Sequence, residues 1–138
     1  MAPSQPVPVP SQLVWQLIKG NNCFIVNGLH GKKFSSEPGN LYNLHSYKHS
    51  GLANEKVVDI SAGEDGGVKV SKSRPKHGNK PAAFKHCTIA KKKNFRRTAV
   101  NVGKDVGSFR PDLKAAALAR VSAVNRSQKA KAAAESKA

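Results

Sequence analysis

The distribution of charge along the chain limits its possible folds more than any other feature. The 138 residues contain 24 Lys and Arg against 8 Asp and Glu, a formal net charge of +16. Residues 1–65 carry five basic and five acidic side chains, so residues 66–138 carry the whole excess. Repulsion between these charges destabilises a compact state unless a polyanion neutralises them. The sequence therefore predicts one small domain whose second half presents a basic surface.

The content of apolar residues predicts a modest core. Hydrophobic residues make up 38% of the chain, below the roughly 45–50% of compact domains. The longest apolar run, residues 115–119, is far shorter than the roughly 18 residues of a membrane span. We therefore expect neither a transmembrane protein nor a membrane partner.

The start of the chain and the cysteines indicate the cellular compartment. The opening MAPSQPVPVP has no continuous apolar segment of a secretory signal. Cys23 and Cys87 lie far apart and neither belongs to a C-x-x-C pair, which argues against a disulfide scaffold or a cysteine-rich zinc module. We expect a protein of the reducing cytosol or nucleus.

The first half predicts one helix and two strands. A short amphipathic helix is predicted within residues 11–22, with Ser11 as N-cap and Gly20 as stop. Its apolar residues recur at helical spacing: Leu13, Val14, Leu17 and Ile18. The compact apolar run at 23–26 and a segment at 33–36 are predicted strands.

The second half predicts a hairpin and helices. Residues 55–61 and 67–73 alternate around a turn with Asp65-Gly66, which is typical of a β-hairpin. A weak helical pattern follows at 91–102. A stronger helix begins near Pro111, and its apolar stripe comprises Leu113, Ala117, Val121 and Val124. The fold class is therefore α+β, a small antiparallel sheet with packed helices.

Both ends of the chain differ from this pattern. Residues 1–10 form a Pro-rich extension that favours polyproline II. Residues 129–138, KAKAAAESKA, lack any bulky apolar residue, and we expect coil unless an anionic partner neutralises their lysines. The predicted organisation is a Pro-rich extension, an α+β domain over 11–128 with a basic second half, and a Lys/Ala-rich tail, with both tails disordered or ordered by a partner.

A basic cluster in the second half predicts phosphate binding. Acidic residues are nearly absent from it, which a merely solvated surface does not explain, and each phosphate contact releases counterions. The candidate contact residues are Lys72, Arg74, Lys76, Lys80, Lys91, Lys92, Lys93, Arg96, Arg97 and Arg110. Phe95 could stack on an unpaired base, but burial is the favoured interpretation.

Other chemistry is poorly supported. His45 and His49 stand four residues apart without further metal ligands nearby, and Cys87 has no accompanying base. The HGKK of residues 30–33 lacks the glycine and the Ser or Thr of a P-loop. We expect no enzyme, no cofactor, no metal and no small-molecule substrate.

Four segments contain distinctive motifs: residues 13–24, 34–54, the hairpin and 110–129, including Ser-x-Glu-Pro-x-Asn-Leu, Ser-Tyr-Lys-x-Ser-Gly-Leu and Arg-Pro-Asp-Leu. In combination these segments resemble the family of eukaryote-specific ribosomal protein twenty-eight of the large (60S) subunit. This chain has Gly39 where the family usually has asparagine. The resemblance implies a small α+β protein at the surface of the cytosolic large subunit, without catalysis.

The same resemblance implies partners and location. They are ribosomal RNA of the large subunit and neighbouring large-subunit proteins, in the cytoplasm, with assembly in the nucleolus and a supporting role in translation. Because double-helical RNA offers little sequence readout, recognition by shape and backbone is expected. Alternatives are a ribosome-assembly factor, from which the chain differs by lacking a long acidic extension, an architectural DNA-binding protein, and a small enzyme using Cys87 or the His45 and His49 pair.

Overall fold

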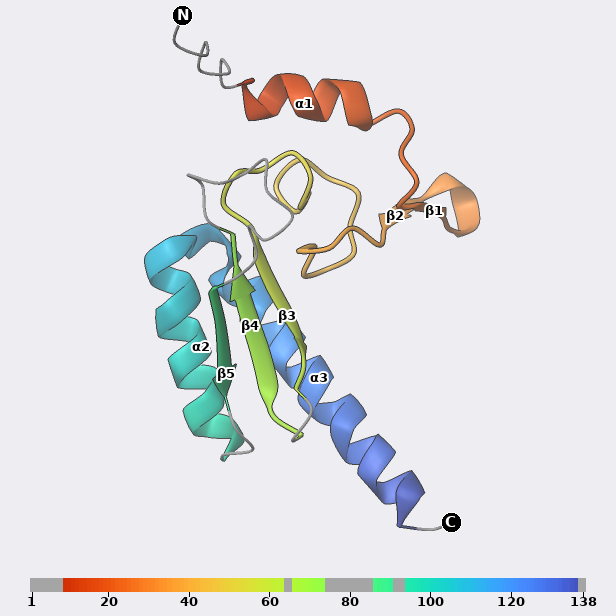
Figure 1. Cartoon of the computed structure of the whole chain (residues 1–138). Coiled ribbons are helices and arrows are strands. Elements are labelled where there is room, and N and C mark those ends of the chain that lie inside the picture. Colours follow the sequence, from red (N-terminus) through yellow and green to blue (C-terminus); the bar gives the residue numbers. More distant parts are fainter. Residues whose placement is uncertain (1–8, 64–65, 74–85, 91–93, 137–138) are drawn as a thin grey trace, which may run out of the picture.

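The computed structural model describes residues 9–63, 66–73, 86–90 and 94–136, with residues 86–90 described by their backbone (Figure 1). Within these ranges it has three α-helices and two antiparallel sheets, so the predicted α+β class is confirmed. The elements in chain order are α1 (Ser11–Ile18), β1 (Ile25–Asn27), η1 (Leu29–Gly31), β2 (Lys33–Ser35), β3 (Val58–Ala62), β4 (Val68–Lys72), β5 (His86–Ala90), α2 (Phe95–Phe109), η3 (Pro111–Leu113) and α3 (Lys114–Glu135).

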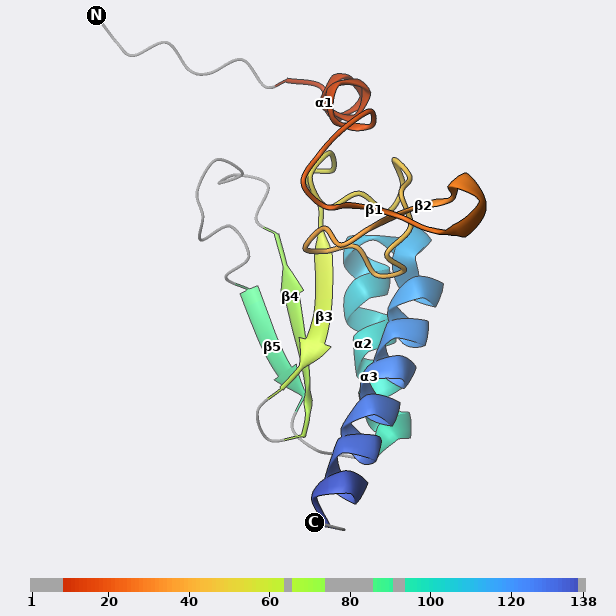
Figure 2. The same ribbon diagram turned by 90° about the vertical axis from the view of Figure 1, so that its right-hand side faces the viewer.

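These elements form two lobes. The C-terminal lobe (57–135) is a two-layer structure in which α2 and α3 cover one face of the sheet β3-β4-β5 (Figure 2). The N-terminal lobe (11–54) contains α1, the β1–β2 hairpin and a long loop segment. It lies at the end of the large sheet where β3 begins (Figures 1 and 2).

The predicted hairpin at 55–73 is confirmed. β3 and β4 pair antiparallel with Ile60 opposite Val70, and the turn between them contains Gly66 at φ +69°. The positive φ is a conformation that glycine adopts without steric cost. Ile60 and Val70 are buried against the helices, while Lys69 on the opposite face is exposed, as strand alternation requires.

The strand β5 was not predicted from the sequence. It pairs antiparallel with β4, with Thr88 opposite Val70. Its sequence HCTIA is short and has only a weak alternation, and it lies between two strongly basic segments. Tertiary pairing with β4 decides its conformation more than local sequence does.

The hydrophobic core lies mainly in the C-terminal lobe. Twelve described residues form it, and three of them, Leu41, Val58 and Ile60, precede residue 66. The four residues of the predicted α3 stripe, from Leu113 to Val124, are all buried in it. Within the described residues, the basic half therefore supplies most of the apolar side chains of this core.

Helix α3 extends further than predicted. The Lys/Ala-rich segment expected to be coil is helical as far as Glu135, and it projects beyond the sheet (Figure 1). Alanine and lysine are good helix formers, and the preceding docked turns remove the cost of nucleation. Propagation from a docked helix explains why the segment does not need an anion to become helical.

Helix α1 is present as predicted, but its packing differs. The residue at the N-cap is Pro10, and Ser11 Oγ lies 2.7 Å from the hydroxyl of Tyr47. The ring of Trp15 faces the rings of His45 at 5.1 Å and Tyr47 at 6.2 Å between centroids. None of its residues is fully buried, so aromatic contacts rather than an aliphatic core hold this helix.

A buried carboxylate organises the loop segment of the N-terminal lobe. Glu37 Oε2 accepts hydrogen bonds from Ser50 Oγ (2.7 Å) and from the backbone N–H groups of Gly51 (3.0 Å) and Leu52 (3.4 Å). A Cβ at Gly39 (φ +82°) would collide with the side chain of Val57. Close packing thus requires a glycine at this position of the chain.

Candidate nucleic-acid interface

The structure describes four of the ten predicted contact residues: Lys72, Arg96, Arg97 and Arg110. The other six lie outside the described residues: Arg74, Lys76, Lys80, Lys91, Lys92 and Lys93. The four described residues separate into two that bond within the protein and two that face solvent.

Lys72 takes part in an internal contact. Its Nζ lies 2.9 Å from Asp105 Oδ1 of α2, and its side chain is only 17% exposed. The same ammonium group lies 5.9 Å from the centroid of the Phe109 ring, a cation–π distance. These contacts join β4 to α2, and they support a role for Lys72 in the fold.

Arg110 connects the two lobes. Its guanidinium pairs with both carboxylate oxygens of Asp112, at 3.2 and 2.7 Å, and is 14% exposed. It also donates to the backbone carbonyls of Lys56 (3.0 Å) and Lys48 (3.2 Å). The hydrogen bond from Arg110 holds the pKa of Asp112 below its ordinary value. Most donors of this arginine are used within the protein.

Arg96 and Arg97 are exposed in the first turn of α2. The unpaired N–H groups and the macrodipole at a helix N-terminus add to the positive potential there. Phe95, beside them, is 42% exposed, so the favoured interpretation of burial is wrong and a stacking role stays open. This turn can therefore offer cations and an aromatic ring to an anionic partner.

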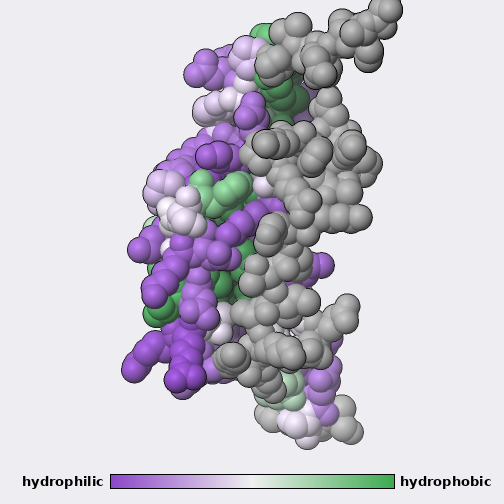
Figure 3. All heavy atoms as spheres, turned by 60° about the vertical axis from the view of Figure 1, so that its left-hand side comes forward, coloured by the Kyte–Doolittle hydropathy of each residue, from purple (hydrophilic) through white to green (hydrophobic). Residues whose placement is uncertain are grey.

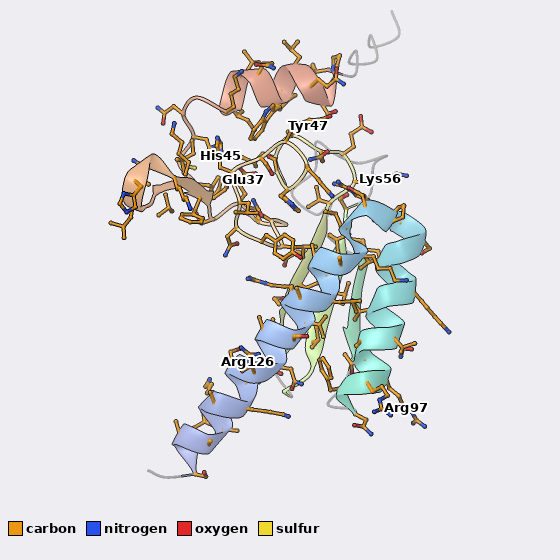
Figure 4. The ribbon with its side chains drawn as sticks, turned by 180° about the vertical axis from the view of Figure 1, so that it is seen from behind. Glu37, His45, Tyr47, Lys56, Arg97 and Arg126 are labelled. Atoms are coloured by element: carbon orange, nitrogen blue, oxygen red, sulfur yellow. The ribbon has the colours of Figure 1, made fainter. Side chains whose placement is uncertain are left out.

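Helix α3 brings more cations to the same end of the molecule. α2 and α3 pack against each other, and the start of α2 and the end of α3 lie away from the N-terminal lobe in both views (Figures 1 and 2). Figure 4 shows Arg97 and Arg126 in the half of the molecule opposite Glu37 and His45. We name this cluster of exposed residues the distal basic end: Arg96, Arg97, Arg126, Lys129 and Lys131.

Three members of the distal basic end were not among the predicted contacts. Arg126 falls within the predicted helix, and Lys129 and Lys131 fall within the tail predicted to be coil. The signal that could have found them is helical continuity, because an uninterrupted Ala-rich segment extends the helix past residue 128. Only the fold shows that this extension and the start of α2 both lie away from the N-terminal lobe.

The few acidic groups of the basic half do not neutralise the distal basic end. Asp105 pairs with Lys72 and Asp112 with Arg110, both within the body of the lobe. Glu135 lies 3.9 Å from Lys131 in an exposed pair, which is weak in water. The space-filling view toward α2 is correspondingly dominated by hydrophilic side chains (Figure 3). The positive charge at this end remains open to a partner.

The histidines that were considered as metal-binding or catalytic candidates, and also Cys23, contact ordinary structural neighbours or solvent. The ring of His45 packs at a tilt against Trp15 and its Nε2 lies 3.0 Å from the Lys19 carbonyl, while His49 and Tyr42 pack edge to face. Burial and the nearby Lys48 lower the pKa of His49. Cys23 is a free, exposed thiol, and Cys87 belongs to β5.

In the part of the chain that the structure describes, no group of three His, Cys, Asp or Glu residues is arranged to hold a metal ion. No helix in the same part is long and apolar enough to cross a membrane.

The fold and the distal basic end place the chain among small basic α+β proteins with an open cationic surface. Residues 13–127 match the family described as the Ribosomal L28e protein family. The chain belongs to this family, a family of ribosomal proteins and not of enzymes, which confirms the resemblance found in the sequence.

Three relatives named "Large ribosomal subunit protein eL28" illustrate the similarity. The chain is 42% identical to that of Dictyostelium discoideum, over 79% of this chain and 81% of the relative. It is 33% identical to that of Schizosaccharomyces pombe, over 89% and 96%. It is 36% identical to that of Caenorhabditis elegans, over 78% and 86%.

Proposed function

We propose that this protein is a structural constituent of the cytosolic large ribosomal subunit and binds ribosomal RNA through its distal basic end. Membership of the family and the names of its relatives support the assignment to the large subunit. The observation that carries the RNA contact is that exposed cations of the first turn of α2 and of the last turns of α3 lie in the half of the molecule away from the N-terminal lobe.

The arrangement suits the backbone of folded RNA. Arg96 and Arg97 project from a helix start, where backbone N–H groups also favour an anion. Arg126, Lys129 and Lys131 lie along the last turns of α3, which extend beyond the sheet. Cations distributed along a projecting rod can contact successive phosphates, so shape and backbone rather than base sequence would determine recognition.

The remaining predicted contacts fit this proposal to different degrees. Lys91, Lys92 and Lys93 directly precede Asn94, the residue before α2, and belong to the proposed RNA surface together with Arg74, Lys76 and Lys80. Lys72 acts mainly by joining β4 to α2, and Arg110 by joining the two lobes, which holds that surface in place. Neighbouring proteins of the large subunit are further proposed partners, and the same role includes nucleolar assembly and support of translation.

Charge reversal at the distal basic end tests the proposal. The double variant Arg96→Glu and Arg97→Glu should weaken binding to deproteinised large-subunit RNA and reduce the salt dependence of log K by about 2, roughly one unit for each lost phosphate contact. A matched control with the same change in net charge, Lys19→Glu and Lys48→Glu, alters two exposed lysines of the N-terminal lobe. Equal losses in the two double variants would contradict the proposal, because net charge alone would then explain binding.

A further inference from the structure

The tip of the β1–β2 hairpin presents an isolated apolar side chain to solvent. Leu29 in η1 is 85% exposed, more than any other large apolar residue that the structure describes. The hairpin stands out from the side of the N-terminal lobe in both ribbon views (Figures 1 and 2). We name residues 28–33 the hairpin tip. Burial of this side chain against a partner would remove apolar surface from water.

The backbone of the hairpin tip is fixed in one shape. His30 (φ 58°) and Gly31 (φ 71°) are consecutive left-handed residues. The N–H of Gly28 donates to the Lys32 carbonyl at 2.7 Å. The ring of Phe34 packs so closely on Gly28 that a Cβ there would lie 2.6 Å from a ring carbon. Leu29 is therefore held outward by a preorganised turn, which lowers the entropic cost of binding.

Two lysines follow the exposed leucine closely in the sequence. Lys32 and Lys33 are exposed and are two of the five basic residues within 1–65. No acidic residue lies between residue 1 and Glu37, which is buried. The HGKK motif, which fails as a P-loop, thus makes the hairpin tip a local positive site.

A comparison with α1 shows what kind of partner fits. Leu17 on α1 is 73% exposed, but no charged residue occurs from Ser11 to Ile18. Lysines are depleted in the cores of protein–protein interfaces. RNA offers the combination that the hairpin tip matches, because unstacked bases have apolar faces and are flanked by phosphates.

We propose that the hairpin tip is a second RNA contact, in which Leu29 rests on an unstacked base or a ribose face while Lys32 and Lys33 bind the adjacent phosphates. This inference rests on the proposed function and extends it to the N-terminal lobe. Together with the distal basic end, it gives the protein two RNA contacts at separate parts of the molecule, which would fix its orientation on folded RNA.

Photo-crosslinking within assembled particles identifies the partner of the hairpin tip. A photoreactive residue replaces Leu29 in one variant and Leu17 in the control, and particles are purified from cells that make the full chain. A crosslink to ribosomal RNA from position 29 is the expected result. A crosslink to a protein, or none to RNA, would overturn the inference, while recovery of both variants in large subunits would leave the proposed function intact.

Binding measurements separate this inference from the proposed function. With deproteinised large-subunit RNA, Leu29→Ala should weaken affinity about tenfold with an unchanged salt slope, whereas Leu17→Ala should change it less than about twofold. Lys32→Glu with Lys33→Glu should reduce the salt slope by about 1 to 2. If Leu29→Ala binds like the unaltered chain while Arg96→Glu with Arg97→Glu binds weakly, the inference fails and the proposed function survives. If all these variants bind like the unaltered chain, both fail.

Discussion

In the C-terminal lobe, aliphatic side chains from β3, β4, α2 and α3 meet in one core, whereas in the N-terminal lobe a buried carboxylate and packed aromatic rings hold loops together. Ile60, Val106 and Val121 are fully buried in the C-terminal lobe. In the N-terminal lobe, Glu37 accepts hydrogen bonds from three donors, and Trp15 packs against His45 and Tyr47. The two lobes therefore achieve order by different physical means.

The exposed apolar residues follow the same division. Eleven large apolar residues are exposed in the described part of the chain, and eight of them lie in the N-terminal lobe. These eight are Leu13, Leu17, Val26, Leu29, Phe34, Tyr42, Leu44 and Leu52. The C-terminal lobe, which carries most of the net charge, needs a strong core to withstand it, while the N-terminal lobe leaves apolar surface available to partners. Net charge and apolar surface thus indicate different contacts in the two lobes.

The largest effect should come from the core of the basic lobe. Ile60→Ala removes a fully buried side chain and should lower the free energy of unfolding by about 2–5 kcal/mol. Leu17→Ala, a change at an exposed position of α1, should alter it by less than about 0.5 kcal/mol. Urea unfolding followed by circular dichroism checks both values. Similar losses for the two variants would refute the assignment of the core to one lobe.

A smaller and more local effect is expected in the N-terminal lobe. Glu37→Ala leaves Ser50 Oγ and the amides of Gly51 and Leu52 without their acceptor, at a cost of about 1–3 kcal/mol. Glu37→Gln keeps an acceptor oxygen and should cost less, and Glu55→Ala, at an exposed site, serves as control. Hydrogen exchange at residues 51–52 measures the loss. Unchanged protection in Glu37→Ala would show that the carboxylate does not organise this lobe.

The junction between the lobes should weaken in acid, with the smallest effect of the three. The pKa of His49 is lowered, so its contribution to stability is intact above its ordinary pKa of about 6.5 and is lost as pH falls below it. The pKa of Asp112 is also lowered, so its pairing with Arg110 stabilises above about pH 3.9 and is lost in stronger acid.

Unfolding measured between pH 7.5 and 5 tests the histidine contribution. His49→Gln should remove part of the decline in stability over this range, because glutamine does not take up a proton. His30→Gln, at the exposed hairpin tip, is the matched control and should leave the decline unchanged. Identical pH profiles for His49→Gln and the unaltered chain would exclude His49 as a contributor to this dependence.

The sequence predicted the elements whose periodicity is strong and local. The β3–β4 hairpin follows from alternation around Asp65-Gly66, and the buried face of α3 follows from the spacing of Leu113, Ala117 and Val121. The strand β5 was missed because its pairing partner, not its own residues, determines its conformation. The helical tail was missed because its stability depends on the docked turns before it.

The candidate site was predicted only in outline. The charge distribution located the basic half, but sequence could not separate exposed cations from those bound inside the fold. Lys72 meets Asp105 only in the folded chain, and the carbonyls of Lys48 and Lys56 reach Arg110 only there. That the exposed cations of α2 and α3 lie away from the N-terminal lobe also became visible only in the fold.

The most direct test of the central claim, that this protein is a stable constituent of the large subunit, is sedimentation of a cell lysate through a sucrose gradient before and after a high-salt wash. A stable constituent should co-migrate with large subunits, monosomes and polysomes, and it should remain with them after the wash. Confinement to nuclear precursor particles would indicate an assembly factor, and confinement to chromatin a DNA-binding protein. Either result would contradict the assignment of this protein to the large ribosomal subunit.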